Sequence, residues 1–277
     1  MSNFPPCYKI STLSEFIGKV KECRQRWELD PHEKLWFRGE DADYDDQCLR
    51  PKIYRPKSKA VALKPIDELL EIEYDLLIRF RQESSQYQSV SADPDYETWD
   101  WYFLMQLHGA PTRLLDWSES SLIALYFAVR DVERKSDVSD PCVFVHAPVI
   151  KGKLNVSVYN RYIPRSEITQ KFPIIKKFRN KISLPNQAID LLPDYNRRRI
   201  AAQRSRFVLF GRDPAYLCDR YNNDNNASRA LVKIEIDKSQ IEDIRMELRD
   251  SGITESLIFP DLDGVGREIY SEWLDRI

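Results

Sequence analysis

The sequence predicts an α+β fold, with a mixed or antiparallel sheet and a helical elaboration at the N-terminus. Long helical patterns dominate the first part of the chain, short strand-like runs gather later, and the two kinds do not alternate regularly. The 277 residues contain neither an internal repeat nor a Gly/Ser linker. We therefore expect one domain over residues 1–277.

The first half of the chain carries mainly helical patterns. A capping box at Thr12–Glu15 begins the helical segment that we expect within residues 1–30. Residues 34–40 (KLWFRGE) alternate and are rich in β-forming side chains, so they predict a strand. An amphipathic helix is then expected over about 65–86, and an aromatic-rich helix over about 95–108.

The rest of the chain, from about residue 112, carries shorter patterns that are rich in strand-forming residues. Ser118 is expected to be the N-cap of a helix that follows an extended stretch at 112–117. Residues 150–200 are mixed and basic, and we expect an insertion-like segment there. Further strands are predicted at 142–149, 206–211, 230–236 and 253–259, with a helix at 239–249.

The composition argues against several classes of protein. The 42 basic and 44 acidic residues give a formal charge of −2, which is unlike a globally basic nucleic-acid binder. The three histidines show no metal-ligand spacing, so we expect no metal, and the 8 glycines form no GxGxxG or P-loop pattern. No apolar run is long enough to span a bilayer, and the five cysteines are scattered. We therefore expect a cytoplasmic protein without membrane association.

Arg38 and Gly39 are the first candidate site residues. By alternation, Arg38 lies on the strand face opposite Phe37. A guanidinium suits a phosphate, a carboxylate or a ribose edge, and Gly39 would let a ligand or another backbone approach closely. The alternative for Arg38 is an ion pair with Glu40 or Asp41.

A second candidate is the polar segment at 108–118 (HGAPTRLLDWS), which separates two strongly apolar helices. Dense polarity between core helices is typical of a ligand-binding loop on a rigid scaffold. Structural roles remain open, because Arg113 and Asp116 could form a buried pair and His108 could be a structural histidine. The candidate ligand contacts in this segment are His108, Thr112, Arg113, Asp116, Trp117 and Ser118.

Gln203 and Glu255 are the later candidates. Five arginines occur within residues 197–206 and could contact phosphates, although a solvated helix face is the alternative. Gln203 lies close to the strand predicted next and is the better candidate to point inwards. Glu255 is expected on the strand at 253–259 among apolar neighbours, where desolvation would raise the pKa of its carboxyl group.

These segments resemble the FRG-domain family, which is named for its Phe-Arg-Gly motif. The matching segments are LWFRGE at 35–40, QLHGAPTRLLDWSESSLIALYFAV at 106–129, RRIAAQRSRF at 198–207 and GITESLIFPDLDG at 252–264. Arg204-Ser205 stands where the third segment would be expected to carry a glycine. The resemblance implies a shared fold, and a toxin or phage-defence role would suit it.

The order of motifs is also similar to that of ADP-ribosyltransferases, which implies an ADP-ribosyltransferase-like fold with NAD as the substrate. Arg38-Gly39 corresponds to an early Arg-Gly pair, Ser118–Phe127 to a Ser-containing stretch before an Ala/Phe-rich helix, and Glu255 to a late-strand acid with Gln203 as its rival. The implied catalytic residues are Arg38, Glu255 and Gln203.

The same resemblance implies how NAD would bind. Arg38 would grip the phosphates or the nicotinamide ribose, with Gly39 beside it, and Tyr126 or Trp117 would stack on the nicotinamide. Glu255 would bind the ribose 2′-OH and stabilise an oxocarbenium-like transition state. ADP-ribose would pass to a macromolecule, either protein or nucleic acid, or to water. The alternative is a non-catalytic ligand- or nucleic-acid-binding module that uses the same cleft and the basic stretch at 171–206.

Overall fold

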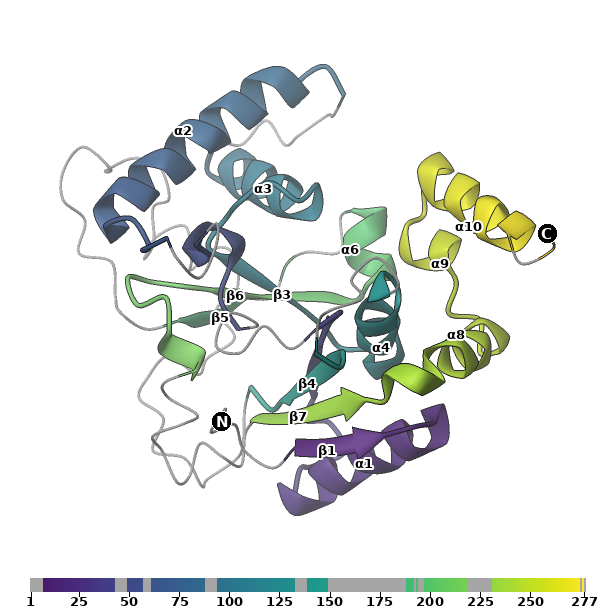
Figure 1. Cartoon of the computed structure of the whole chain (residues 1–277). Helices are drawn as coiled ribbons and strands as arrows, with labels where there is room; N and C mark the ends of the chain where they lie inside the picture. Colours follow the sequence, from purple (N-terminus) through teal and green to yellow (C-terminus); the bar gives the residue numbers. More distant parts are fainter. Residues whose placement is uncertain are drawn as a thin grey trace.

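The computed structural model describes most of the chain and confirms the α+β class, with a seven-stranded mixed sheet and helices against it (Figure 1). The described residues are 7–42, 49–56, 61–87, 94–132, 139–148, 188–191, 193, 197–218, 231–274 and 276. Most of the basic segment at 150–200, including the lysines from 171 to 181, lies outside these ranges.

The sheet has the strand order β1-β7-β4-β2-β3-β6-β5. Its strands are β1 (Cys7–Ile10), β2 (Trp36–Glu40), β3 (Leu114–Ser118), β4 (Cys142–His146), β5 (Ile189–Leu191), β6 (Ser205–Leu209) and β7 (Leu231–Ile236). The edge strand β1 is parallel to β7, and the other neighbouring pairs are antiparallel.

The sheet is weakly joined at its centre, between β2 and β3. All five residues of β2 pair with β4, and all five residues of β3 pair with β6. Between β2 and β3 the register contains one pair, Phe37 with Ser118. Most backbone N–H and C=O groups on the facing edges of β2 and β3 therefore do not pair with each other and need other hydrogen-bond partners. The sheet therefore consists of two well-paired halves with an opening between them.

Different helices cover the two halves of the sheet (Figure 1). Helices α1 (Leu13–Arg26), α4 (Ser121–Val129) and α8 (Ile241–Asp250) share one apolar core with β2, β4 and β7. Helices α2 (Ile66–Ser84) and α3 (Pro94–Leu107) share another core with β3, β5 and β6. Short 3₁₀ helices occur at η2 (Lys52–Tyr54) and η5 (Lys238–Gln240).

Gly39 lets α4 approach β2 closely. A Cβ atom on Gly39 would lie 1.9 Å from the carbonyl oxygen of Ala124 and 2.7 Å from the backbone nitrogen of Ala128. No side chain can occupy that space without moving α4, so a residue without Cβ is required here. The expected close approach at Gly39 is therefore confirmed, and the approaching group is the backbone of α4.

The prediction of a last strand at 253–259 is wrong. Residues Glu255–Ile258 form the short helix α9, and the Thr254 hydroxyl accepts a hydrogen bond from the backbone N–H of Leu257 at its N-terminus. The apolar side chains of Ile258 and Phe259 pack with Ile123 of α4. Capping and this contact with α4 favour a helical turn over pairing with the sheet.

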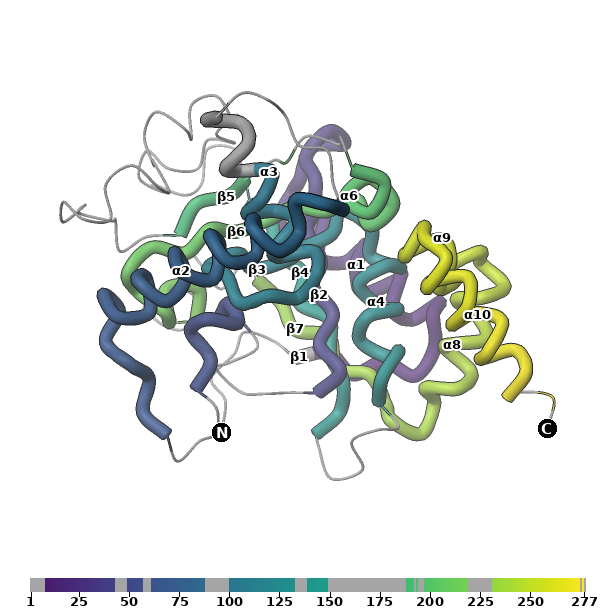
Figure 2. Tube along the Cα trace, turned by 90° about the horizontal axis from the view of Figure 1, so that it is seen from above, coloured from purple at the N-terminus to yellow at the C-terminus, as the bar shows by residue number. Residues whose placement is uncertain are grey.

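The C-terminal part of the described chain is helical. Helix α10 (Leu262–Leu274) follows α9, and α8, α9 and α10 lie together at one end of the molecule (Figure 2). The short helix α6 (Arg198–Ala202) contacts α9 and leads into β6. Within the described ranges, no helix has both the length and the apolar character needed to cross a bilayer.

The expected N-cap at Ser118 is also wrong. Ser118 is the last residue of β3, and Ser120 caps α4 by accepting the backbone N–H of Ile123 at 3.5 Å. The Ser118 hydroxyl instead donates to the carbonyl oxygen of Gln203 at 2.7 Å. Ser118 therefore joins β3 to the end of α6, rather than starting α4.

Candidate active site

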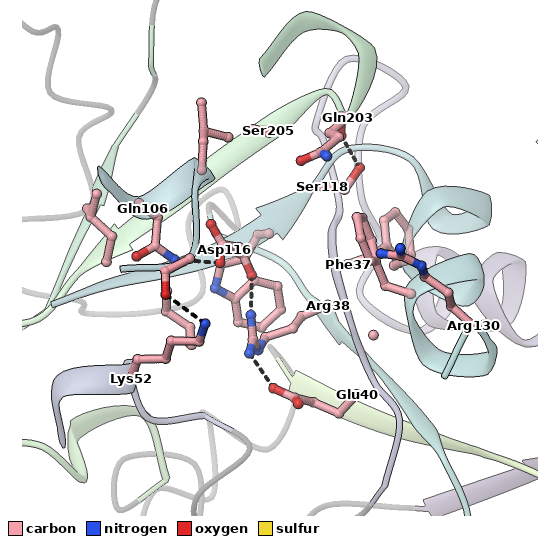
Figure 3. A pocket seen from close by; sticks show the side chains of 18 of the residues that line it. Phe37, Arg38, Glu40, Lys52, Gln106, Asp116, Ser118, Arg130, Gln203 and Ser205 are labelled. Atoms are coloured by element: carbon pink, nitrogen blue, oxygen red, sulfur yellow. Dashed lines mark hydrogen bonds and ion pairs between the residues drawn. The ribbon is translucent and has the colours of Figure 1, made fainter. Parts of the chain in front are cut away.

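A pocket of about 400 Å³ opens where β2 and β3 part (Figure 3). Its wall combines β2, β3, the end of α3, η2, α4, α6 and the segment after α9. Pockets of about 300–1,000 Å³ are typical of small-molecule and cofactor sites. One part of the pocket carries both signs of charge around Asp116, and another part is rich in arginine around Phe259.

Asp116 is held in the pocket wall by a short chain of hydrogen bonds. The buried Thr112 hydroxyl donates to the Gln106 side-chain oxygen, which turns the Gln106 amide nitrogen toward Asp116. That nitrogen donates to the Asp116 carboxylate at 2.6 Å. The order of donors and acceptors fixes which end of the Gln106 amide faces the carboxylate.

The pKa of Asp116 is raised above its ordinary value. Desolvation is the main cause, because neighbouring side chains displace water from part of the carboxylate, although Asp116 is exposed on the pocket side. The positive charges of Arg38 and Lys52 and the hydrogen bond from Gln106 act in the opposite direction. Asp116 therefore presents a carboxylate to the pocket, and its positively charged neighbours do not bring its pKa back to the ordinary value.

Arg38 bridges the opening between the two halves of the sheet. Its guanidinium donates to the backbone carbonyl of Asp116 at 2.9 Å and pairs with the Glu40 carboxylate. Arg55 also pairs with Glu40, at 3.1 Å. The expected ion-pair alternative for Arg38 is thus confirmed, and this pairing leaves the guanidinium on the pocket wall. Figure 3 shows Gln106, Asp116, Arg38 and Glu40 in one continuous network.

The arginine-rich part is formed by α4, α6 and the segment after α9. Arg130 at the end of α4 and Arg199 on α6 line the pocket beside Phe127 and Phe259. In Figure 3, Arg130 lies on the other side of Phe37 from Asp116 and Lys52. Guanidinium groups on aromatic rings suit anionic ligands, because the ring fixes the orientation of the donors.

Six predicted site residues lie together in the pocket wall. These residues are Arg38, Gly39, Asp116, Trp117, Ser118 and Gln203. Gln203 faces the pocket near Ser118, and its side-chain nitrogen donates to the carbonyl oxygen of Ile258 at 3.3 Å. Trp117 is almost fully buried and packs against His146. The sequence thus located both strands and the α6 segment of the site.

Arg113 and Thr112 do not reach the pocket. The Arg113 side chain is buried and pairs with Glu73 on α2 at 2.6 Å, so the expected Arg113–Asp116 pair is wrong. Tyr102 donates to the same Glu73 carboxylate. Thr112 does not line the pocket, but its hydroxyl orients the side chain of Gln106, which does. Both residues support the site rather than line it.

His108, Tyr126 and Glu255 also lie outside the pocket lining. His108 is exposed after the end of α3. Tyr126 packs against the core that α4 shares with β2, β4 and β7, and against the apolar cluster that contains Ile258 and Phe259. Glu255 accepts from Arg130 at 2.8 Å and from Arg267 at 2.5 Å. Burial raises the pKa of its carboxyl group, as expected, while Arg267 opposes the shift. Glu255 therefore positions arginines at the rim.

Several pocket residues were not singled out from the sequence. They are Lys52, Arg55, Gln106, Phe127, Arg130, Ser205 and Phe259, whereas Arg199 was among the five arginines at 197–206. Gln106 and Phe127 lie inside the segment at 106–129 that resembles the FRG-domain family, so this resemblance could have indicated them as site residues. Lys52 comes from a proline-rich stretch without periodicity, and only the fold brings it to Gly109, whose carbonyl oxygen it contacts at 3.0 Å.

Comparison with known proteins agrees with the first resemblance. Residues 33–137 match the family model described as the FRG domain. This range contains β2, α2, α3, β3 and α4, and hence Arg38, Gln106, Asp116 and Arg130, whereas α6 and α9 lie beyond it. No curated protein and no solved structure matches the chain. No group of His, Cys, Asp or Glu positioned to hold a metal ion occurs among the described residues.

Proposed function

We propose that this chain, with its FRG domain at residues 33–137, binds NAD in the pocket between β2 and β3 and cleaves the bond between nicotinamide and ribose. ADP-ribose then passes to a macromolecular acceptor or to water. The observation that carries the proposal is a pocket lined by the Asp116 carboxylate and, beside Phe259, by Arg130 and Arg199.

NAD carries charged groups that could be bound by Asp116 and by the arginines around Phe259. Its nicotinamide ring is a cation, and its two phosphates are anions. Asp116 would face the nicotinamide ribose, while Arg130 and Arg199 lie toward the phosphates. Opposite charges arranged in this way favour one orientation of the ligand over the reverse.

The proposed reaction needs positioning and electrostatics more than covalent catalysis. The C1′–N bond breaks, and its electron pair leaves with nicotinamide as a neutral molecule. Positive charge develops on the ribose, where the Asp116 carboxylate would stabilise it. An oxygen of water or of the acceptor then bonds to C1′, and its proton passes to solvent or to Asp116.

Asp116 replaces Glu255 as the proposed acid. Glu255 lies outside the pocket lining and its carboxylate pairs with Arg130 and Arg267. Asp116 is open to the pocket and lies next to Arg38, the residue of the Phe-Arg-Gly motif. A group that stabilises a developing charge must lie within a few ångströms of it.

Incubation with NAD labelled in the adenylate portion tests the proposal and identifies the product. Nicotinamide and free ADP-ribose are separated by chromatography, and label on RNA, DNA or extract proteins is measured after their addition. Nicotinamide release with free ADP-ribose indicates hydrolysis, and label on one polymer identifies the acceptor class. No release from folded protein under any of these conditions would contradict the proposal and favour a binding module.

A further inference from the structure

Three guanidinium groups surround the ring of Phe259. The guanidinium carbons of Arg199, Arg130 and Arg267 lie 4.4, 4.6 and 5.0 Å from the ring centroid. These arginines come from α6, α4 and α10, so the fold and not one local motif brings them together. Arg199 and Arg130 face the pocket, while Arg267 lies outside its lining.

The three arginines of this cluster differ in their ionic partners. Glu255 pairs with both Arg130 and Arg267, and Arg130 also lies 3.9 Å from the Asp131 carboxylate. Arg199 makes no hydrogen bond or ion pair through its side chain within the described residues, and its Nε atom is buried without a partner. Asp261 attracts Arg199 only at longer range. Burial and the repulsion from Arg267 and Arg130 lower the pKa of Arg199.

Such an arrangement is unfavourable until an anion joins it. A buried donor without an acceptor is destabilising, and like charges that share a small space repel each other. A phosphate offers acceptor oxygens to both arginines and offsets the repulsion between them. Arginine forks match phosphate oxygens in bidentate geometry.

We propose that Arg199 and Arg130, on the platform of Phe259, form a subsite for a phosphoryl or pyrophosphoryl group. The identification of that group with the pyrophosphate of NAD rests on the proposed function, whereas the anion site itself does not. Arg38, which the motif resemblance assigned to the phosphates, is the weaker candidate because Glu40 and the Asp116 carbonyl occupy its guanidinium.

The subsite also lies close enough to Asp116 for one ligand to reach both. Asp116 is among the groups whose charge acts on Arg199, and both residues line the same pocket. A ligand anchored by its phosphates at Arg199 would therefore extend toward Asp116. The arginine subsite fixes the direction in which a dinucleotide enters.

Calorimetric titration with inorganic pyrophosphate tests the subsite without requiring catalysis. The variant is Arg199→Gln, and the matched control is Arg198→Gln, an exposed neighbour on the same helix. We expect pyrophosphate affinity to fall at least tenfold in Arg199→Gln and less than twofold in Arg198→Gln. Arg199→Lys keeps the charge but loses the fork, so an intermediate affinity is expected. Circular dichroism verifies that each variant is folded.

The outcomes separate the subsite from the NAD reaction. Pyrophosphate binding that disappears in Arg199→Gln, in a protein that does not cleave NAD, would support the subsite and reject the NAD reaction. Equal pyrophosphate binding by wild type and Arg199→Gln would overturn the subsite, whatever the result with NAD. Wild-type protein that does not bind pyrophosphate at low ionic strength would overturn it as well.

Discussion

Arg113 forms its ion pair with Glu73, forty residues earlier in the chain, and so leaves Asp116 to the pocket. The Glu73 carboxylate also accepts the backbone N–H of Arg113 at 2.7 Å and the Tyr102 hydroxyl. Both charged side chains are at most 3% exposed. This network fixes α2 and α3 against the beginning of β3, and with it the wall that carries Asp116.

Loss of the Glu73 charge should destabilise the fold strongly. Glu73→Gln leaves the Arg113 guanidinium buried without a counter-charge, which costs about 3–5 kcal/mol. Urea unfolding monitored by tryptophan fluorescence measures the change in the free energy of unfolding. Glu71→Gln, at an exposed position on the same helix, is the control and should change it by less than about 0.5 kcal/mol. Equal effects of the two substitutions would contradict the structural role of the pair.

The two glycines Gly39 and Gly18 should respond oppositely to alanine. Gly39→Ala forces Cβ against the backbone of α4, so we expect a loss of about 1–3 kcal/mol or more. Gly18 lies within α1 with nothing within 4 Å of its Cβ position, so Gly18→Ala should stabilise by about 0.5–1 kcal/mol. Thermal unfolding of both variants tests the contrast, and a stable Gly39→Ala would show that α4 does not need the glycine.

Thr112 should affect the proposed reaction through Gln106, although its hydroxyl also accepts the backbone N–H of Leu114 at 3.0 Å. Thr112→Val removes the hydroxyl that orients the Gln106 amide, so Asp116 loses a hydrogen bond that lowers its pKa. We expect kcat for nicotinamide release to fall about tenfold and the acidic limb of its pH profile to move to higher pH. Thr112→Ser keeps the hydroxyl and should restore both quantities. A Thr112→Ser variant as impaired as Thr112→Val would exclude this relay.

Asp116 should reduce stability at neutral pH. The folded protein raises the pKa of Asp116 above its ordinary value of 3.8, so the folded state holds this proton to a higher pH than the unfolded state. Stability consequently decreases as pH rises from 3.8 through the folded-state pKa. Asp116→Asn should therefore be more stable than wild type at pH 7, and this gain should shrink as the pH is lowered. Asp75→Asn, on an exposed part of α2, should show no comparable gain; a destabilised Asp116→Asn at pH 7 would contradict the expectation.

The positions of β2, α2, α3, β6 and β7 could be predicted because each carries a clear local pattern. Alternation in KLWFRGE and the helical period after Pro65 both act over a few residues. The order of strands could not be predicted in the same way. The parallel pairing of β1 with β7 joins Tyr8 to Ile234, and no local pattern encodes such a distant partner.

The predictions for Glu255 and Arg113 were wrong because they relied on local sequence patterns. Residues 253–259 alternate well enough for a strand, but Thr254 caps a helical turn and Phe259 packs with Phe127 of α4. The proposed Arg113–Asp116 pair ignored that residues three apart on an extended chain face opposite sides. That signal was present in the sequence, whereas the true partner, Glu73, is visible only in the fold.

The rate of nicotinamide release from NAD should be compared between wild type, Asp116→Asn and Glu255→Gln. If Asp116 stabilises the developing charge, Asp116→Asn should lose about 100-fold or more in kcat while remaining folded. Glu255→Gln, which disturbs Arg130 and Arg267 at the rim, should retain most of kcat and change mainly KM. Full activity in Asp116→Asn together with loss in Glu255→Gln would move the catalytic acid to Glu255 and contradict the role of Asp116.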